Sequence, residues 1–290
     1  MARHPRSAST VLGVLAAAVF TACGTSPAAQ QPSPQPSPSS AQPAPPPAPA
    51  PPTSTPSSTV DRPTTVPSGP PASGPVVVLD PGHNGGNADN PAAINRTVPA
   101  GRGQTKACNT TGTATATGYR EHQFTWDLSV RVRDLLAARG VRVVMTRPDD
   151  NGVGPCVNER AAIGNRAGAA AVVSLHADGS ESVGAHGFHI AYSAPPLNAA
   201  QGEPSLRLAR LLRDGLRSAG MATSSYIGSD GMSPRNDLGG LNLSERPTAL
   251  VECGNMRNPA EAAVMTTPAG RQRYAGAIAA AVLDYLQAGG

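Results

Sequence analysis

Two histidines and two glutamates stand at positions from which they can act together on a metal ion. His83 follows the apolar run of residues 76–79, and His176 and Glu252 end two later apolar runs. Glu121 stands at the start of a helical pattern that follows a long segment rich in glycine, asparagine and threonine. Two histidines and one glutamate are a common ligand set of hydrolytic zinc sites, which keep a further position for water. The remaining glutamate can then serve as a general base.

The elements that carry these residues alternate between strands and helices. Several predicted strands are apolar on both faces, which is typical of a parallel sheet covered by helices on both sides. The sequence therefore predicts one α/β domain with a mostly parallel, twisted sheet flanked by helices on both faces. Ligands of such sheets gather beyond the carboxyl ends of the strands. We expect strands at residues 76–79, 141–145, 171–175, 187–192, 241–243 and 249–253, helices at residues 121–140, 158–167, 206–219, 259–265 and 271–286, and a long loop or small hairpin at residues 84–118.

Each of these residues also has an ordinary structural interpretation. Glu121 alone is an acid at a helix N-terminus, which the helix dipole favours. His122 competes with it as a ligand, but adjacent helix residues point about 100° apart, so only one of them can face the site. For Glu252, the cost of burying a carboxylate in an apolar run argues for a metal-binding or catalytic role.

Other polar residues near these runs are expected to have structural roles. His186 and His189 lie three residues apart on a predicted strand. Their side chains would point to opposite faces, so we interpret both as structural or rim residues. Asp80 and Asp178 flank the two histidines. Either can orient an imidazole ring as a hydrogen-bond partner, but an aspartate that caps a turn is the more common case.

Taken in order, these segments resemble a known family. The motifs are Val78-Leu79-Asp80-Pro81-Gly82-His83, then Glu121, then Ser174-Leu175-His176-Ala177, then Leu250-Val251-Glu252-Cys253-Gly254. They are similar to the zinc-dependent N-acetylmuramoyl-L-alanine amidases of the amidase-3 family, and the resemblance covers residues 76–285. Between the motifs, Thr146-Arg147, Glu159-Arg160 and Asn165-Arg166 also match the family pattern.

The resemblance implies a cofactor and a reaction. Zinc (Zn2+) would bind to His83, Glu121 and His176, and Glu252 would be the general base and acid. The bond cut would be the amide between N-acetylmuramic acid and L-alanine of peptidoglycan or muropeptides. Departures from the family pattern, such as Cys253 and Asn255 after the catalytic glutamate, spare all four chemical residues. The alternatives are a catalytically silent peptidoglycan-binding or regulatory protein and a zinc peptidase that cuts within the stem peptide.

The N-terminal part of the chain has the character of an export signal and a linker. Residues 1–23 combine Arg3 and Arg6 with a short apolar run and end at Cys23, which predicts an export signal of the lipoprotein type. Cys23 would then carry a lipid and attach the protein to the membrane. An ordinary cleaved signal and a secreted enzyme are the alternative. Residues 24–75, rich in proline, alanine and serine, are predicted to be a disordered linker, and residues 76–290 the catalytic domain.

Export determines how the remaining cysteines are interpreted. Cys108 and Cys156 fall in predicted loops, where an oxidising compartment favours a disulfide. Cys253 lies inside an apolar run and is predicted to be a buried free thiol. The formal net charge is +4, but the chain has no basic stripe with interleaved aromatic residues, which argues against a nucleic-acid partner. We expect an envelope enzyme that acts as a monomer.

Overall fold

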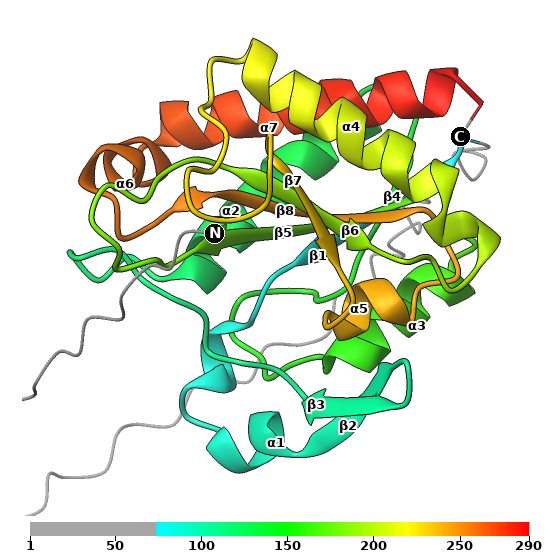
Figure 1. Cartoon of the computed structure of the whole chain (residues 1–290), viewed down its shortest axis with the longest axis horizontal. Helices are drawn as coiled ribbons and strands as arrows, with labels where there is room; N and C mark the ends of the chain where they lie inside the picture. The colour runs from blue at the N-terminus through cyan, green and yellow to red at the C-terminus, as the bar shows by residue number, and fades with distance from the viewer. Residues whose placement is uncertain (1–73, 290) are drawn as a thin grey trace, which may run out of the picture. The chain divides into compact units, whose positions relative to one another are not determined.

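A six-stranded sheet lies at the centre of the folded part of the chain (Figure 1). The computed structural model describes residues 74–289. The strand order of the sheet is β4-β1-β5-β8-β6-β7. Strand β6 runs antiparallel to β8, and all other neighbouring strands are parallel. The strands are β1 (Val76–Pro81), β4 (Arg142–Met145), β5 (Ala171–Asp178), β6 (His189–Ser193), β7 (Met232–Arg235) and β8 (Thr248–Asn255). The prediction of an α/β fold with a mostly parallel sheet is confirmed.

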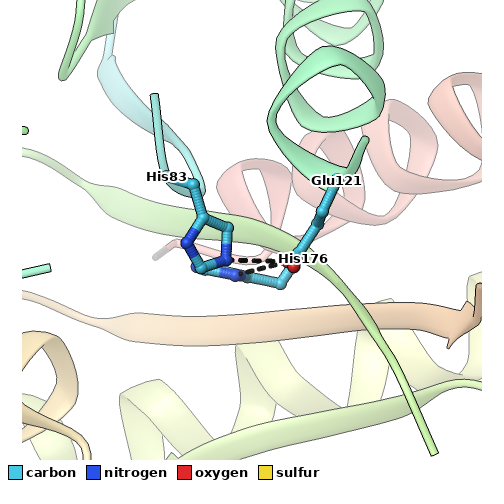
Figure 2. A group of neighbouring side chains, drawn as sticks. All are labelled: His83, Glu121 and His176. Carbon is cyan, nitrogen blue, oxygen red and sulfur yellow. Dashed lines mark hydrogen bonds and ion pairs between the residues drawn. The ribbon is translucent and has the colours of Figure 1, made fainter. Parts of the chain in front are cut away.

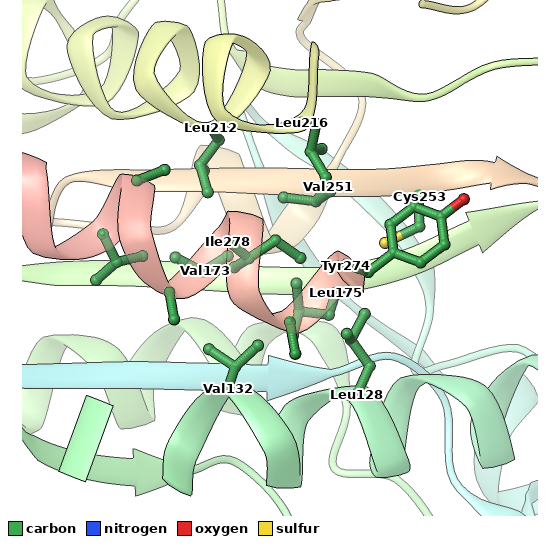
Figure 3. Packing of buried hydrophobic residues seen from close by; sticks show 14 of the residues in the cluster. Leu128, Val132, Val173, Leu175, Leu212, Leu216, Val251, Cys253, Tyr274 and Ile278 are labelled. Carbon is green, nitrogen blue, oxygen red and sulfur yellow. The ribbon is translucent and has the colours of Figure 1, made fainter. Parts of the chain in front are cut away.

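Helices cover the two faces of the sheet unequally. One face carries α2 (Glu121–Ala137), α4 (Glu203–Ser218) and α7 (Pro268–Gln287), which enclose the main apolar core (Figure 3). The other face carries α3 (Val157–Arg166) and α5 (Gly239–Asn242) and has a much smaller buried cluster. In Figure 1, α4 and α7 lie above the sheet, and α3 and α5 lie below it. The short helix α6 (Pro259–Met265) precedes α7.

Strand alternation decides which residues reach each face. In β5, Val173 and Leu175 belong to the main core, whereas Val172 packs in the small cluster on the opposite face. Because side chains alternate along a strand, His176 shares the face of Val172. The same alternation in β8 buries Val251 in the main core and turns Glu252 to the other side. The thinly covered face of the sheet therefore carries the polar residues.

Residues 84–118 form a small subdomain beside this face. It contains the short helices η1 (Gly85–Asn87) and α1 (Pro91–Asn95) and an antiparallel hairpin of β2 (Thr97–Gly101) and β3 (Gln104–Ala107). A disulfide between Cys108 and Cys156 joins the end of the hairpin to the start of α3, across a sequence separation of 48. Cys253 is buried and free. The predictions of a hairpin, of this disulfide and of a buried thiol are confirmed.

The predicted strand at residues 241–243 is wrong, because this segment forms the short helix α5. Long-range contacts hold the helical turn. The side-chain nitrogen Nδ2 of Asn242 donates to the carbonyls of Ala100 and Asn236, and its side-chain oxygen accepts from Arg102. Two of these partners belong to the β2–β3 hairpin region, which no local pattern around residue 241 reveals.

The sheet also differs from the prediction near β6 and β7. Strand β7 was not predicted, because Met232-Ser-Pro-Arg has no apolar alternation. It forms by pairing with β6 at the sheet edge, where a proline is tolerated. Strand β6 begins at His189 rather than residue 187, since Gly187 has a φ of 95° and cannot be extended. His186 is therefore exposed outside the strand, and its predicted place on one strand with His189 is wrong.

Removal of the disulfide is expected to destabilise the domain without removing its fold. Cross-linking a loop of this length restricts the unfolded chain, so the double variant Cys108→Ser/Cys156→Ser should lose about 2–4 kcal/mol of unfolding free energy. Urea titration of the two proteins measures the loss. Reductant should destabilise the wild type and leave the double variant unchanged. Equal stability of variant and wild type would contradict the prediction.

Candidate active site

His83, Glu121 and His176 meet at one point (Figure 2). The Oε1 atom of Glu121 lies 3.0 Å from Nε2 of His83 and 3.0 Å from Nδ1 of His176. The two imidazole rings are 4.9 Å apart and nearly perpendicular. One donor atom from each of the three residues lies within 4.8 Å of the others. The expectation from the sequence that these three residues lie close together agrees with the structure.

Three different elements bring these side chains together. His83 follows β1 and has a φ of 57°, a left-handed conformation that few non-glycine residues adopt. Gly82 precedes it and packs so closely against the ring of His176 that a Cβ there would overlap the ring. His176 lies within β5, and Glu121 is the first residue of α2. The turn after β1 is therefore shaped by contact with the neighbouring strand.

Residues 110–113 of the long segment enclose the site from the other side. The ring Nδ1 of His83 lies 3.0 Å from the carbonyl oxygen of Thr110, which leaves Nε2 directed at Glu121. The amide of Thr113 donates to Oε2 of Glu121 at 2.9 Å. Between them, Gly112 has a φ of 76°, and a Cβ there would collide with both His83 and Glu121. The sequence showed a long loop but gave no signal for these contacts.

The competition between Glu121 and His122 is decided by a contact outside the site. Nδ1 of His122 lies 2.8 Å from Oδ2 of Asp150, and the histidine is buried there. Glu121 turns to the opposite side, where its Oε1 also accepts from the amide of Ala177. The prediction that only one of the two faces the site agrees with this arrangement.

The pKa values of His83 and Glu121 depend on each other. Burial by itself raises the pKa of Glu121, but the charge of His83 and hydrogen bonds from both histidines lower this pKa far below its ordinary value. Burial lowers the pKa of His83, and the neighbouring carboxylate of Glu121 raises it above its ordinary value overall. Two imidazoles around one ionised carboxylate are a donor set that fits a divalent cation.

Glu252 lies beside this cluster on the same face of the sheet. It pairs in register with His176 of β5 and with His189 of β6. Its Oε2 atom is buried and has no hydrogen-bond partner. Burial raises the pKa of Glu252 well above its ordinary value, and the charges of Glu121 and Asp178 raise it further. Both causes disfavour the charged form of this carboxyl group.

A cavity of about 210 Å³ opens beside these residues. Glu252, His176 and His83 are among its lining residues, together with residues of the sheet, α3, α5 and the β2–β3 hairpin. Its walls include the apolar side chains of Val157, Val172, Leu241 and Leu250. Among residues 74–289, the buried carboxylate oxygen without a hydrogen-bond partner thus belongs to a residue that lines this cavity.

The flanking acids and histidines have structural contacts. Asp178 accepts a hydrogen bond from the hydroxyl of Tyr226. His189 is buried 3.7 Å from Asp178, and burial lowers the pKa of His189 to about 4 despite the charge of that aspartate. The structural interpretation of His189 agrees with this burial. Asp80 makes no hydrogen bond to the ring of His83 or His176 and forms an ion pair with Arg160 instead, at 2.7 Å.

Comparison with known proteins identifies related chains. A family model described as N-acetylmuramoyl-L-alanine amidase matches residues 77–284. The chain is 51% identical over 214 residues to the N-acetylmuramoyl-L-alanine amidase Rv3717 of Mycobacterium tuberculosis, which covers 74% of this chain and 87% of that protein. It is 52% identical to the crystal structure of the amidase Ami1 of Mycobacterium smegmatis, with a TM-score of 0.72 and coverage of 74% and 98%. The germination-specific amidase of Bacillus subtilis is 24% identical over 233 residues.

Asp80 is expected to make stability depend on pH in the acid range. Burial alone would raise its pKa, but Arg160 and the hydroxyls of Thr146 and Ser174 lower it from 3.8 to about 2. Because the pKa is lower in the folded state, ionised Asp80 stabilises the fold above pH 4 and loses this effect as the pH falls towards 2. The contribution is about 2 kcal/mol.

Unfolding free energies of Asp80→Asn and wild type, measured from pH 5 to pH 2, test this expectation. The deficit of the variant should shrink as the pH falls. The exposed control Asp89→Asn should follow the wild type throughout. A deficit that stays constant down to pH 2 would show that the charge of Asp80 is not responsible.

Proposed function

The chain belongs to the amidase-3 family and is an N-acetylmuramoyl-L-alanine amidase, and we propose that it uses zinc held by His83, Glu121 and His176. The reaction is hydrolysis of the amide that joins N-acetylmuramic acid to L-alanine in peptidoglycan. The support for zinc is the donor set of two imidazole nitrogens and one carboxylate, which is typical of hydrolytic zinc sites with a position left for water.

Glu252 is the general base and acid of the proposed mechanism. The observation that carries this role is the buried, unpartnered Oε2 atom of Glu252, a residue that pairs with His176 and lines the cavity. Glu252 accepts a proton from the water that attacks the lactyl carbonyl. It then delivers this proton to the nitrogen of the departing L-alanine. A raised pKa suits a carboxyl group that must both take and return a proton near neutral pH.

The other residues of the site bind and orient. A bound divalent cation would supply Lewis acidity towards the scissile carbonyl and lower the pKa of water. Thr110 holds the ring of His83 with Nε2 directed at the site, and the amides of Thr113 and Ala177 hold the carboxylate of Glu121. Such outer hydrogen bonds fix ligand orientation. All the ligands and Glu252 come from one chain, which supports a monomeric enzyme.

The alternatives to an amidase lose support at this site. A catalytically silent relative on this fold is expected to lack a ligand or the general base, whereas His83, Glu121, His176 and Glu252 are all present and adjacent. A peptidase that cuts within the stem peptide would use the same chemistry, but the family and the related enzymes are amidases of the N-acetylmuramoyl-L-alanine bond.

The location that suits this substrate is the cell envelope. We propose that residues 1–23 direct export, that Cys23 is lipidated and that residues 24–75 form the linker to the catalytic domain of residues 76–290. The signal, Cys23 and nearly all of the linker lie outside the described residues. Among residues 74–289, no helix has both the length and the apolar composition to cross a membrane.

Alanine substitutions are expected to identify the metal ligands. His83→Ala, Glu121→Ala and His176→Ala should each lower zinc below one ion per chain, because each removes a donor. Metal analysis of the purified proteins measures the loss, and His186→Ala is a control at an exposed histidine outside the site. Full metal and full activity in Glu121→Ala would remove it from the ligand set.

Glutamine at position 252 is expected to separate metal binding from turnover. Glu252→Gln should keep the fold and the zinc but lose turnover by on the order of a hundredfold or more, because an amide cannot carry the proton. Turnover is measured by mass spectrometry of digested muropeptides. The products of the wild-type enzyme should be glycan with free muramic acid and an intact stem peptide. The exposed control Glu245→Gln should keep wild-type turnover. Near-normal turnover of Glu252→Gln would exclude it as the base.

Lipidation of Cys23 is expected to determine whether the protein partitions into a detergent phase or an aqueous phase. Two or more acyl chains anchor a protein stably, so the wild-type protein from its native envelope should enter a detergent phase, whereas Cys23→Ala should stay in the aqueous phase. Mass analysis of the N-terminus identifies the modification. A wild-type protein in the aqueous phase with an unmodified N-terminus would instead support a secreted enzyme.

A further inference from the structure

We propose that Arg147 and Arg160 are positioning residues of the metal centre. Their guanidinium groups hold the turn that carries His83 and the first turn of α2, which carries Glu121, in the ligand geometry. This inference rests on the proposed metal site. Both arginines belong to pairs that the sequence comparison singled out, Thr146-Arg147 and Glu159-Arg160, and neither takes part in the chemistry described above.

Arg160 reaches the His83 turn from α3. Its Nη2 donates to the carbonyl of His83 at 2.7 Å, and its Nη1 donates to the carbonyl of Pro81 at 2.6 Å. The same guanidinium group also donates hydrogen bonds to the carbonyls of Gly154 and Pro155. The residue is only 5% exposed. One planar group thus fixes carbonyl groups on both sides of Gly82.

Arg147 reaches the same turn from the end of β4 and joins it to α2. Its Nε donates to the carbonyl of Pro81 at 3.1 Å, and its Nη2 lies within 3.3 Å of the carbonyl of Gly82. The same Nη2 donates to the carbonyl of His122 at 3.0 Å. His122 directly follows Glu121, so Arg147 links the segments of two proposed ligands.

Asp80 extends the connection to the third ligand. Its Oδ1 accepts from Arg160 at 2.7 Å, and its Oδ2 accepts from the hydroxyl of Ser174 at 2.7 Å. Ser174 lies two residues before His176 on the same face of β5. The arginines and Asp80 therefore form one buried network. It contacts the backbone of the His83 turn, the carbonyl of His122 next to Glu121, and the side chain of Ser174 two residues before His176.

The His83 turn needs such support. A non-glycine residue in the left-handed region is strained and persists only where its surroundings over-determine it. The φ of His83 is 57°, and the carbonyls of Pro81, Gly82 and His83 all accept from buried guanidinium nitrogens. Without these donors the turn would lose the contacts that oppose relaxation, and the imidazole would leave its place.

A role in the stability of the fold alone does not explain well why these two buried positions are arginine. The side chain of Arg147 is fully buried, and its acidic partner Asp150 is 18% exposed. Burying a guanidinium group has a large desolvation cost, and apolar residues of similar size often give equal or better stability. A planar group with five donors is suited to fixing several carbonyls in one geometry. Lysine, with one nitrogen, cannot reproduce this pattern.

The test compares lysine variants in the full-length enzyme. Arg147→Lys and Arg160→Lys keep the charge but lose the fork of donors. The control is Arg246→Lys, because Arg246 holds the carbonyls of Ala169 and Gly168 in a loop that carries no ligand. Zinc affinity is measured by competition with a chromogenic chelator, and the Co(II)-substituted proteins give an absorption spectrum. Thermal unfolding of the metal-free proteins measures stability separately.

We expect zinc binding to weaken by roughly 10–100-fold in Arg147→Lys and Arg160→Lys, the range for outer partners of metal ligands. Their Co(II) bands should shift, whereas Arg246→Lys should keep the wild-type affinity and spectrum even where its stability falls. Zinc affinity and Co(II) spectra equal to the wild type in Arg160→Lys would overturn the proposal. If Arg147→Lys does not fold, Arg160→Lys decides alone.

The wild type and His83→Ala separate this proposal from the proposed function. If the wild type binds zinc and His83→Ala does not, but Arg160→Lys binds as tightly as the wild type, the positioning role is wrong and the metal site stands. If the wild type and His83→Ala bind zinc equally, the proposed metal site is wrong, and the positioning role falls with it.

Discussion

A buried carboxylate that must be neutralised organises the site. Glu121 is 4% exposed, and its Oε1 lies 3.0 Å from a ring nitrogen of each histidine. Removing a carboxylate from water costs several kcal/mol unless charge and hydrogen bonds compensate it. The histidines and the amides of Thr113 and Ala177 provide this compensation. The turn after β1, strand β5 and the start of α2 must therefore fit one another closely.

The two faces of the sheet have different roles: one packs the apolar core and the other carries the polar residues of the candidate active site. On one face, α2, α4 and α7 bury a continuous apolar core (Figure 3). On the other face, α3 and α5 leave a cavity into which His176 and Glu252 project. Because alternate residues of a strand point to opposite faces, one strand can supply core residues such as Leu175 and Val251 and their polar neighbours at once. The polar residues are thus placed by the packing of the apolar ones.

The long segment before α2 acts as a wall of the site. The disulfide of Cys108 with Cys156 fastens the end of its hairpin to α3. A few residues later, Thr110 contacts the ring of His83 and Thr113 contacts Glu121. A loop fastened at its base can hold such contacts at little further entropic cost. This explains why a segment without periodic pattern matters to the proposed metal ligands His83 and Glu121.

The sequence by itself determined the main strands and helices and the candidate residues His83, His176 and Glu252, because apolar runs and strand ends are local features. Local patterns reduced the choice between Glu121 and His122 to one of two, and the family resemblance favoured Glu121. The tertiary structure supplies the physical reason, since Asp150 and Arg147 hold His122 away from the site. Contacts with the hairpin region likewise made residues 239–242 a helix, and pairing with β6 made β7 a strand. These outcomes depend on partners far away in the sequence, and no local pattern records the energy of a contact that exists only after folding.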